Sequence, residues 1–360
     1  MTSHVSASST VDNSHHSKQP SSSHSSFVAQ HYNAIPERGI EERVKSRIFH
    51  LRATNNWVKS ILIGDAMKRI RSDKGSPFPP IAVLDLCCGK GGDLQKWKRC
   101  NITSLVCTDI ADVSLQQCRG RYDEMLERSK TEKQYESGRR SLFRTEFVLA
   151  DATKERLKEH YPDRSIIFDL VSCQFSLHYA FESLAQTRTM LRNVAECLSP
   201  GGYFIGTLPD ANRIMYVWKT RSRSNRFQND IVKVEYQSGD VTAADYRPPL
   251  FGATYHFSLD EVVDCPEYLV HFPLLVHLLK EFDLELVSKR TFPEFIEENR
   301  HTHDGKQLLH KMQALEPYPA DDENKLMGCE DKDYDAVKLK QQQFINEGRY
   351  LRGDGHPIKF

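Results

Sequence analysis

The chain has 360 residues, 39% of them hydrophobic and 27% charged, and its 49 basic residues balance 49 acidic residues. This composition is typical of a globular protein with a sizeable core, and one elaborated domain is favoured over two small ones. It excludes net charge as a source of affinity for nucleic acids, so phosphate binding would require a local basic patch.

The cysteines and the apolar runs bear on the cellular compartment. Nine cysteines are scattered without a Cys-x-x-Cys pair, which predicts a reducing compartment and no zinc site. The longest mostly apolar run, residues 268–279, is shorter than the roughly 20 residues that span a bilayer. The N-terminus also lacks the layout of a secretory signal. We therefore expect a soluble protein without membrane association.

Residues 1–28 are rich in serine and histidine and poor in large apolar residues. Such a segment cannot bury enough surface to offset the entropy of ordering, so we predict a disordered tail here and one domain over residues 29–360. The histidines of the tail are better explained by biased composition than by metal binding.

Apolar residues recur at three- and four-residue steps between residues 38 and 70, which predicts amphipathic helix. Gly39 and the pair Asn55 and Asn56 are the points at which this helical stretch would divide. A cluster of breakers at residues 72–80 ends it and leads into the first strand.

Strands and helices alternate in the next part of the chain. The pattern predicts strands at 81–86, 104–109, 146–150, 166–174 and 202–208, with helices from Asp93, over 112–129 and over 182–198. This alternation indicates a Rossmann-like α/β fold, in which a mostly parallel sheet has helices on both faces and binds ligands at the carboxyl ends of its strands.

The alternation stops at residues 211–257, where strand-like segments at 231–236 and 253–257 lie among polar loops. We predict a β insertion over the mouth of the sheet. A helix over 270–282 and a strand over 284–292 are expected to follow it.

The stretch LDLCCGKGGDLQKW, residues 84–97, has the form of a nucleotide-binding turn between a strand and a helix. Gly89, Gly91 and Gly92 permit a tight bend and close approach of a ligand, and the helix N-terminus offers free amides. Cys87 stands where such turns usually have a glycine, so we expect it to weaken ligand binding without abolishing it. Alone, the turn fits a dinucleotide, S-adenosylmethionine or a simple tight connection.

Four strand ends carry a polar residue, namely Asp85, Asp109, Asp151 and Gln174. Asp109 can accept hydrogen bonds from both ribose hydroxyls, and Asp151 from an adenine amino group. Each alone is more often a turn or helix cap, but together they favour an adenosine ligand. Asp85 suits the positive amino-acid end of S-adenosylmethionine, and LSPGGYF at 198–204 is a pattern common in methyltransferases. S-adenosylmethionine is therefore favoured over NAD.

Longer strings of the sequence resemble the eukaryotic mRNA cap guanine-N7 methyltransferases. They are HYN (31–33), SRIFHLRATNNWVKSILIG (46–64), LDLCCGKGGDLQKWK (84–98), VCTDIADVSLQQCRGRY (106–122), CQFSLHYAFES (173–183), MLRNVAECLSPGGYFIGT (190–207), VVDCPEYLVHFPLL (262–275) and KMQALEPYPA (311–320). The resemblance covers about residues 31–335. It implies an enzyme of the class I fold that transfers methyl from S-adenosylmethionine to N7 of the guanosine cap of mRNA.

The resemblance also implies two groups of site residues. The methyl donor would be held by Lys59, Asp85, Cys87, Gly89, Asp109, Asp151, Gln174 and Tyr179, and the cap by Asn55, Asn56, Lys90, Lys96, Arg121, His178 and Glu267. One carboxylate can accept from both the ring N–H and the amine of guanine, which suits Glu267, and the basic residues suit the triphosphate. Because guanine N7 already has a lone pair, no catalytic acid, base or nucleophile and no metal is expected.

Other expectations rest on the resemblance alone. They are binding to the capped 5′ end of nascent mRNA, association with a small activating subunit and with the transcription and capping machinery, a monomeric catalytic subunit, and a nuclear location. The sequence itself contains no clear basic nuclear signal.

The family's usual apolar last strand has no match here, because residues 336–360 diverge. A missing strand would leave an exposed sheet edge.

Three functions are alternatives to an active cap methyltransferase. They are a catalytically impaired form that lacks the last strand and binds the cap or the adenosyl group without turnover, an NAD-dependent oxidoreductase, and a small-molecule methyltransferase. The lack of a pyrophosphate-sized glycine pattern disfavours the second, and the basic residues disfavour the third.

Overall fold

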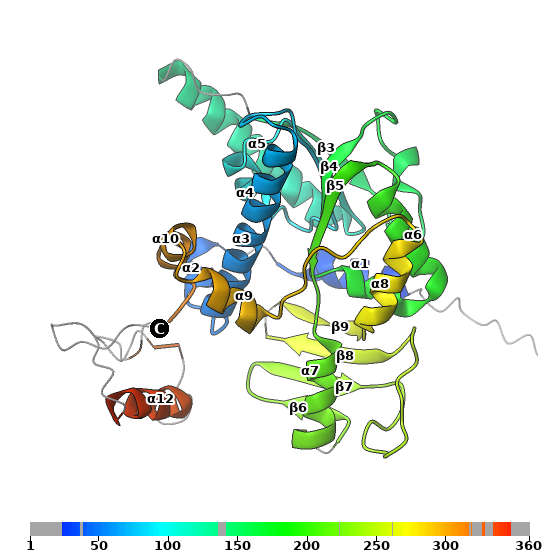
Figure 1. The fold of residues 1–360 in the computed structure, drawn as a ribbon, viewed down its shortest axis with the longest axis vertical. Helices are drawn as coiled ribbons and strands as arrows, with labels where there is room; N and C mark the ends of the chain where they lie inside the picture. Colours follow the sequence, from blue (N-terminus) through cyan, green and yellow to red (C-terminus); the bar gives the residue numbers. More distant parts are fainter. Residues whose placement is uncertain are drawn as a thin grey trace, which may run out of the picture.

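A five-stranded, wholly parallel sheet forms the centre of the protein in the computed structural model (Figure 1). The strands lie in the order β3-β2-β1-β4-β5, with β1 (Ala82–Leu86), β2 (Ser104–Asp109), β3 (Arg144–Leu149), β4 (Phe168–Gln174) and β5 (Leu198–Thr207). The strand order reverses at β1, which has β2 on one side and β4 on the other. In sheets of this kind a ligand crevice lies at that reversal, beyond the carboxyl ends of the strands.

The structure describes residues 24–36, 39–135, 142–222, 224–260, 262–316, 318, 326–327 and 334–346. Most of the predicted tail and the last part of the divergent C-terminus lie outside these residues. Among the described residues, no helix combines the length and the apolar composition needed to cross a bilayer.

Helices cover both faces of the central sheet, as predicted. On one face, α3 (Phe49–Asp73), α4 (Leu94–Arg99) and α5 (Asp112–Tyr135) pack apolar side chains, including Ile63, Trp97 and Tyr122, against the strands. On the other, α6 (Leu184–Ala195) and α8 (Phe272–Lys280) contribute Leu191 and Leu275 to a second core. The pattern of apolar residues in the sequence therefore identified a Rossmann-like fold correctly.

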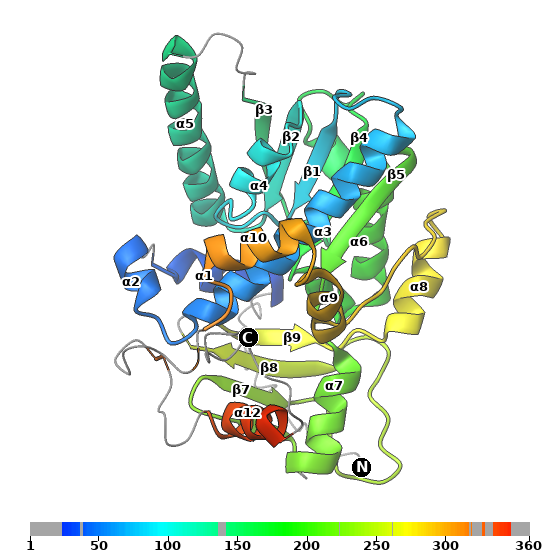
Figure 2. The ribbon, with the colours of Figure 1, turned by 60° about the vertical axis from the view of Figure 1, so that its left-hand side comes forward.

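An antiparallel sheet of four strands lies beside the carboxyl ends of the central strands (Figure 2). It contains β6 (Arg226–Gln228), β7 (Val232–Tyr236), β8 (Thr254–Leu259) and β9 (Val263–Tyr268). The helix α7 (Ala211–Tyr216) continues into the π-helical segment η3 (Val217–Ser222), whose buried Trp218 packs on this sheet. The predicted insertion is confirmed, but its end at Phe257 was wrong. The strand β9 was not predicted because it contains Pro266, and proline argues against a strand. It is nevertheless tolerated here because β9 is an edge strand.

The N-terminal part differs from the prediction in two places. The helix α1 (His24–Ala34) begins inside the predicted tail, because the chain there packs on β9 and α5. The helical stretch divides between α2 (Ile40–Val44) and α3, whereas Asn55 and Asn56 lie within α3. The helices α9 (Phe292–Asn299) and α10 (His303–Met312) pack on α3 around Trp57.

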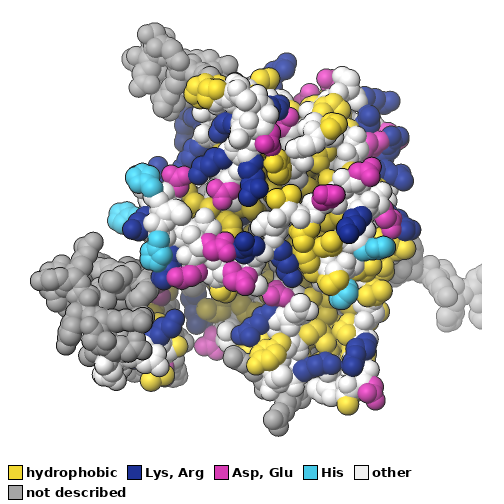
Figure 3. Space-filling view, viewed as in Figure 1, with side chains coloured by type: hydrophobic (Ala, Val, Ile, Leu, Met, Phe, Trp, Pro, Cys, Tyr) yellow, Lys and Arg dark blue, Asp and Glu magenta, His cyan; other side chains and the backbone are white. Residues whose placement is uncertain are grey.

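The predicted strand at 284–292 is wrong. Residues 284–291 form no sheet pairing, and α9 begins at Phe292. A β pattern forms a strand only where a neighbour offers its backbone, and Leu286 and Val287 remain 47% and 64% exposed. In the view of Figure 1, hydrophobic side chains are exposed in the middle of the molecule, between α3 and α8 (Figure 3).

The remaining elements are short or peripheral. The turns η1 (Leu157–Glu159) and η2 (Leu177–Glu182) follow β3 and β4, and η2 with α6 replaces the single helix predicted over 182–198. The described part of the divergent C-terminus is the helix α12 (Asp335–Asn346). Within the described residues the central sheet therefore ends at β5.

Candidate functional site

A cavity of about 2180 Å³ lies between the carboxyl ends of the central strands and the antiparallel sheet. It is lined by every site residue predicted from the sequence except Lys96. The donor residues and the cap residues, which the sequence placed in separate groups, therefore face one continuous space. A cavity at the strand-order reversal is where an α/β fold of this kind binds its ligand.

The turn after β1 is shaped by three residues with positive φ: Cys87 (58°), Gly89 (53°) and Gly91 (74°). The turn is fixed to β2, because the Cys88 N–H donates to the Thr108 carbonyl at 2.9 Å. A Cβ on Gly91 would meet the Cys118 sulfur at 2.7 Å, whereas a Cβ on Gly89 would meet no protein atom within 4 Å. Gly89 thus faces open cavity, where a side chain would take space from a ligand.

Cys87 adopts the left-handed conformation that the sequence suggested would be reserved for glycine. Its thiol interacts with the thiol of Cys173, which is the largest reason why the pKa of Cys87 lies well above its usual value. Cys87 also packs against the core that contains Cys173 while lining the cavity. The strained backbone is therefore compensated in part by contacts of the side chain.

Asp109 lies at the end of β2 and joins the turn to the cavity. One carboxylate oxygen, Oδ2, accepts from the Gly89 N–H at 2.7 Å, and Oδ1 accepts from the Ala111 N–H at 2.9 Å. Burial raises the pKa of Asp109, and these amides oppose the increase. Each oxygen retains a lone pair, so the carboxylate can still accept from a ligand's hydroxyl groups.

Asp151 and Gln174 border the cavity beside Asp109. Asp151 Oδ1 accepts from the N–H of Thr153 at 3.0 Å and from its hydroxyl at 2.6 Å, which is the local turn that the sequence allowed as an alternative. Gln174 is fixed by Ser172 and Thr207, whose hydroxyl groups lie 3.0 and 3.1 Å from the Gln174 amide. Both polar groups are therefore held in place before any ligand binds.

Asp85, on β1, is buried beneath the turn and lines the cavity. The indole N–H of Trp97 donates to its Oδ2 at 3.0 Å. Burial, with the nearby Asp93 carboxylate, raises the pKa of Asp85 to about 8. An acid whose charged form is disfavoured by burial is suited to receive a positively charged ligand group, which would restore the charge balance.

Asp93 is a site residue that the sequence analysis did not identify. Its carboxylate accepts from the ammonium groups of Lys59, at 2.8–3.0 Å, and Lys96, at 2.7 Å. Lys96 also donates to Asn56 Oδ1 and to the Gly92 carbonyl, each at 3.1 Å, which uses its three N–H bonds. Lys96 is buried and, unlike Lys59 and Asn56, does not line the cavity. Its visible role is to hold the turn against α3.

Lys90 and Arg121 are the cavity's basic residues near the turn. Lys90 Nζ donates to the Ile35 carbonyl at 2.7 Å, and Arg121 Nη1 donates to the Lys90 carbonyl at 2.8 Å. Asn55 lines the same side from α3. These groups form the local basic patch that a neutral chain needs if it is to bind phosphates.

Glu267, on β9, is the centre of a buried polar network. Its Oε2 accepts from the Tyr255 hydroxyl at 2.6 Å, and its Oε1 accepts from the Tyr179 hydroxyl at 3.4 Å. Burial pushes the pKa of Glu267 upward, but His178 and the hydroxyl donors outweigh it and hold that pKa below its usual range. The cavity therefore contains a carboxylate that stays ionised although it is only 4% exposed.

His178 lies beside this carboxylate on η2. Its Nε2 is 3.4 Å from Glu267 Oε1, which is within ion-pair distance, whereas Nδ1 has no hydrogen-bond partner among the described residues. The ring is 2% exposed and stands 4.4 Å from the Tyr179 ring, centre to centre. Because a buried polar group without a partner is costly, Nδ1 indicates a place where a ligand completes the site.

The helix α1 closes this part of the cavity. The hydroxyl of Tyr32 lies 3.0 Å from that of Tyr179, and Asn33 bonds to the first turn of α5 through Asp112 at 2.7 Å. Tyr32 and Tyr255 were not predicted as site residues. The string HYN contained the first, but nothing in the local sequence marks Tyr255 as a partner of Glu267 or Tyr32 as a partner of Tyr179.

Fold and site together define a class of protein. A parallel sheet with this strand order, a glycine turn after β1 and acids at the ends of β1 and β2 make up a Rossmann-like α/β protein with a crevice suited to an adenosine-containing ligand. The chain belongs to the mRNA (guanine-N(7))-methyltransferase family, whose domain model matches residues 15–345.

Relatives of the chain carry the same family name. It is 46% identical over 326 residues to an mRNA cap guanine-N(7) methyltransferase of Caenorhabditis elegans, covering 90% of this chain and 80% of the relative. It is 46% identical over 291 residues to one of Drosophila melanogaster, covering 80% and 65%. An enzyme of that name from Oryza sativa subsp. japonica is 38% identical over 293 residues, covering 80% and 73%.

Proposed function

We propose that this protein transfers the methyl group of S-adenosylmethionine to N7 of the guanine that caps mRNA. The observation that carries the proposal is the buried, ionised Glu267 in the same cavity as the glycine turn and Asp109. One end of the cavity offers acceptors for an adenosine and an ammonium group, and the other offers an acceptor for the N–H groups of a guanine.

The donor side fits S-adenosylmethionine through the chain's own polar groups. Asp109 would accept from the ribose hydroxyls, Asp151 from the adenine amine, and Asp85 from the methionine ammonium group. Gly89 leaves room for the ligand beside the turn. When bound, S-adenosylmethionine supplies an electrophilic methyl group on a positively charged sulfur.

The cap side fits guanine and its triphosphate. The carboxylate of Glu267 would accept from the ring N–H and the exocyclic amine of guanine, a pair that adenine does not present. His178, whose Nδ1 has no partner among the described residues, and Tyr179 would position the base between the two ligands. Lys90, Arg121, Asn55 and Asn56 would meet the phosphates and ribose, while Lys96 would act by holding the turn.

These residues promote the reaction by placement. Guanine N7 is a nucleophile that loses no proton, so no general base, acid or protein nucleophile is required. Fixing two reactants in line can supply roughly 7–11 kcal/mol of the barrier reduction. The Glu267 carboxylate also favours the purine as it gains positive charge in the transition state.

We propose four further properties that follow from this function. The protein would bind the capped 5′ end of nascent mRNA, act in the nucleus as a monomeric catalytic subunit, and work with the transcription and capping machinery and a small activating subunit. The local patch of Lys90 and Arg121 supports RNA binding, whereas the other properties rest on family membership.

A single assay tests the function. The full chain is incubated with S-adenosylmethionine labelled in its methyl group and with RNA capped by GpppG, and the digested product is analysed for 7-methylguanosine. We expect label in the cap guanine and none in a matched ApppG-capped RNA. Binding of both ligands without label would support the catalytically impaired alternative and overturn the proposal. The named activity of the relatives gives that alternative no support.

A further inference from the structure

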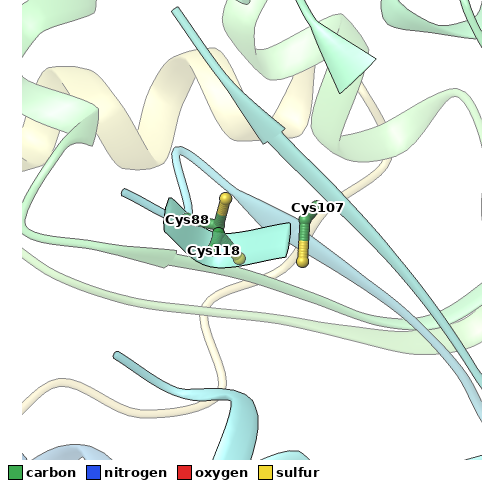
Figure 4. Close-up of side chains that lie close together, drawn as sticks. All are labelled: Cys88, Cys107 and Cys118. Carbon is green, nitrogen blue, oxygen red and sulfur yellow. The ribbon is translucent and has the colours of Figure 1, made fainter. Parts of the chain in front are cut away.

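Three cysteines from different elements meet directly behind the ligand turn (Figure 4). Cys88 belongs to the turn after β1, Cys107 to β2 and Cys118 to α5, and their sulfur atoms all lie within 4.8 Å of one another. Because 18 and 10 residues lie between consecutive members, no Cys-x-x-Cys spacing marks the cluster in the sequence. We name these three residues the thiol cluster.

The surroundings of the thiol cluster are dry on one side and open on the other. Cys107 and Cys118 are buried in the core beneath α5, whereas Cys88 is partly buried and lines the cavity. The turn bends around the cluster, since any Cβ on Gly91 would collide with the Cys118 sulfur. An ion could therefore reach the sulfur atoms from the cavity.

The thiols interact mainly with one another. The three sulfur atoms lie within 4.8 Å of one another, and Cys88 also donates to the Gly89 carbonyl at 3.5 Å. Three sulfur atoms this close together are a ligand set that soft metal ions prefer.

We propose that the thiol cluster binds one zinc ion as three thiolates. A zinc ion with Zn–S bonds of about 2.3 Å places its sulfur ligands about 3.8 Å apart, which is within the spread of this cluster. Each thiol that is still protonated loses its proton to solvent as a Zn–S bond forms. Water from the cavity completes the tetrahedron.

Charge favours a divalent ion over a monovalent one. Three thiolates and Zn²⁺ leave one net negative charge, whereas three thiolates and Cu⁺ leave two. Asp85 is the register partner of Cys107 on the neighbouring strand β1, so a second negative charge would be opposed. Arg121, which lies one helical turn after Cys118 on α5, can balance a single charge.

A bound ion would connect the donor site to the fold. It would join the turn to β2 and α5 at a point one residue from Gly89, whose N–H bonds to Asp109. We therefore expect zinc to stiffen the turn. This role concerns the chain's own stability and needs no participation of the metal in methyl transfer.

The test uses the reduced, chelator-treated full chain and zinc as the sole ligand. Titration against a chromophoric chelator should give one ion per chain, with protons released. Cobalt(II) in place of zinc should give the strong thiolate-to-metal absorption that reports sulfur ligands. Cys118→Ser should weaken zinc binding about 100-fold or more. Cys197→Ser, at a buried cysteine outside the cluster, should leave it unchanged.

Three results would overturn the proposal. They are a stoichiometry well below one, equal zinc affinity in the wild type and Cys118→Ser, and stoichiometric binding of Cu(I) by a chain that does not bind zinc. Binding of S-adenosylhomocysteine by Cys118→Ser shows that the variant is folded. If it does not bind, Cys107→Ala provides the same comparison, so a folding defect in one variant leaves the test intact.

Discussion

The two halves of the cavity are built in different ways. The donor half consists of Asp85, Asp109, Asp151 and Gln174, which lie at or near the carboxyl ends of four strands of one parallel sheet. They are fixed by groups of the same sheet, of its adjoining turns and, for Asp85, of the next helix α4. The cap half brings Tyr32, Tyr179, Tyr255 and Glu267 together from α1, η2, β8 and β9. The donor half depends on local structure, and the cap half depends on tertiary packing.

This difference separates adenosine binding from guanine recognition. A strand end with a glycine turn serves any adenosine-containing ligand, so the donor half alone is compatible with many reactions. The cap half carries one ionised buried carboxylate, and the Nδ1 of the neighbouring His178 has no partner among the described residues. Substitutions in the two halves should therefore change different measured quantities.

The largest effect is expected at the cap half. Glu267→Gln replaces the carboxylate that accepts from two guanine N–H groups and that stabilises the growing positive charge on the purine. The kcat/KM for capped RNA should therefore fall about 1000-fold. Affinity for S-adenosylhomocysteine, measured by calorimetry, should change by less than about twofold, because the donor half remains intact. Glu235→Gln, on the same sheet but outside the cavity, is the matched control. Near-normal turnover in Glu267→Gln would show that guanine is held elsewhere.

The second effect concerns the boundary between the halves. Lys96→Met removes one of two ammonium groups from Asp93 and leaves Asn56 without its donor. The free energy of unfolding should fall by about 3 kcal/mol, measured by urea denaturation. Arg99→Met, exposed on the same helix, should have little effect. If stability were unchanged and only the KM for capped RNA rose, Lys96 would contact the triphosphate after all.

The contrast between the halves also explains what the sequence could predict. The strand ends and the turn follow from short, contiguous sequence patterns. The sequence alone could therefore place Asp109 and Gln174 at the same edge of the sheet. Glu267 and His178 came only from the family resemblance, because a strand such as β9, with Pro266 in it, has no readable period. Tyr32, Tyr255 and Asp93 were missed because their roles arise from contacts between distant segments. The failed strand at 284–292 has the same origin, since an apolar pattern cannot show whether a neighbouring strand is present.

A smaller effect is expected in the donor half. Asp109→Asn replaces the carboxylate by an amide, whose NH2 group would face the N–H of Gly89 or Ala111 instead of accepting from it. The affinity for S-adenosylhomocysteine should therefore fall about 30-fold. Affinity for a cap analogue, measured separately without donor, should remain within about twofold. Asp123→Asn, exposed on α5, is the control. Equal losses for both ligands would mean that the two halves are coupled and would remove the distinction drawn here.

The smallest effect is expected at Cys87, where the donor half departs from a glycine turn. Cys87→Gly relieves a positive φ that costs roughly 1–2 kcal/mol in residues other than glycine, but it also removes the thiol contact with Cys173. We therefore expect S-adenosylhomocysteine to bind only about threefold more tightly. Cys87→Ala separates the two causes, because it keeps the strained backbone and removes the sulfur. Tighter binding by the glycine variant alone would assign the effect to strain, and tighter binding by both would assign it to the sulfur. Unchanged affinity in both would show that the turn already has the shape that the donor requires.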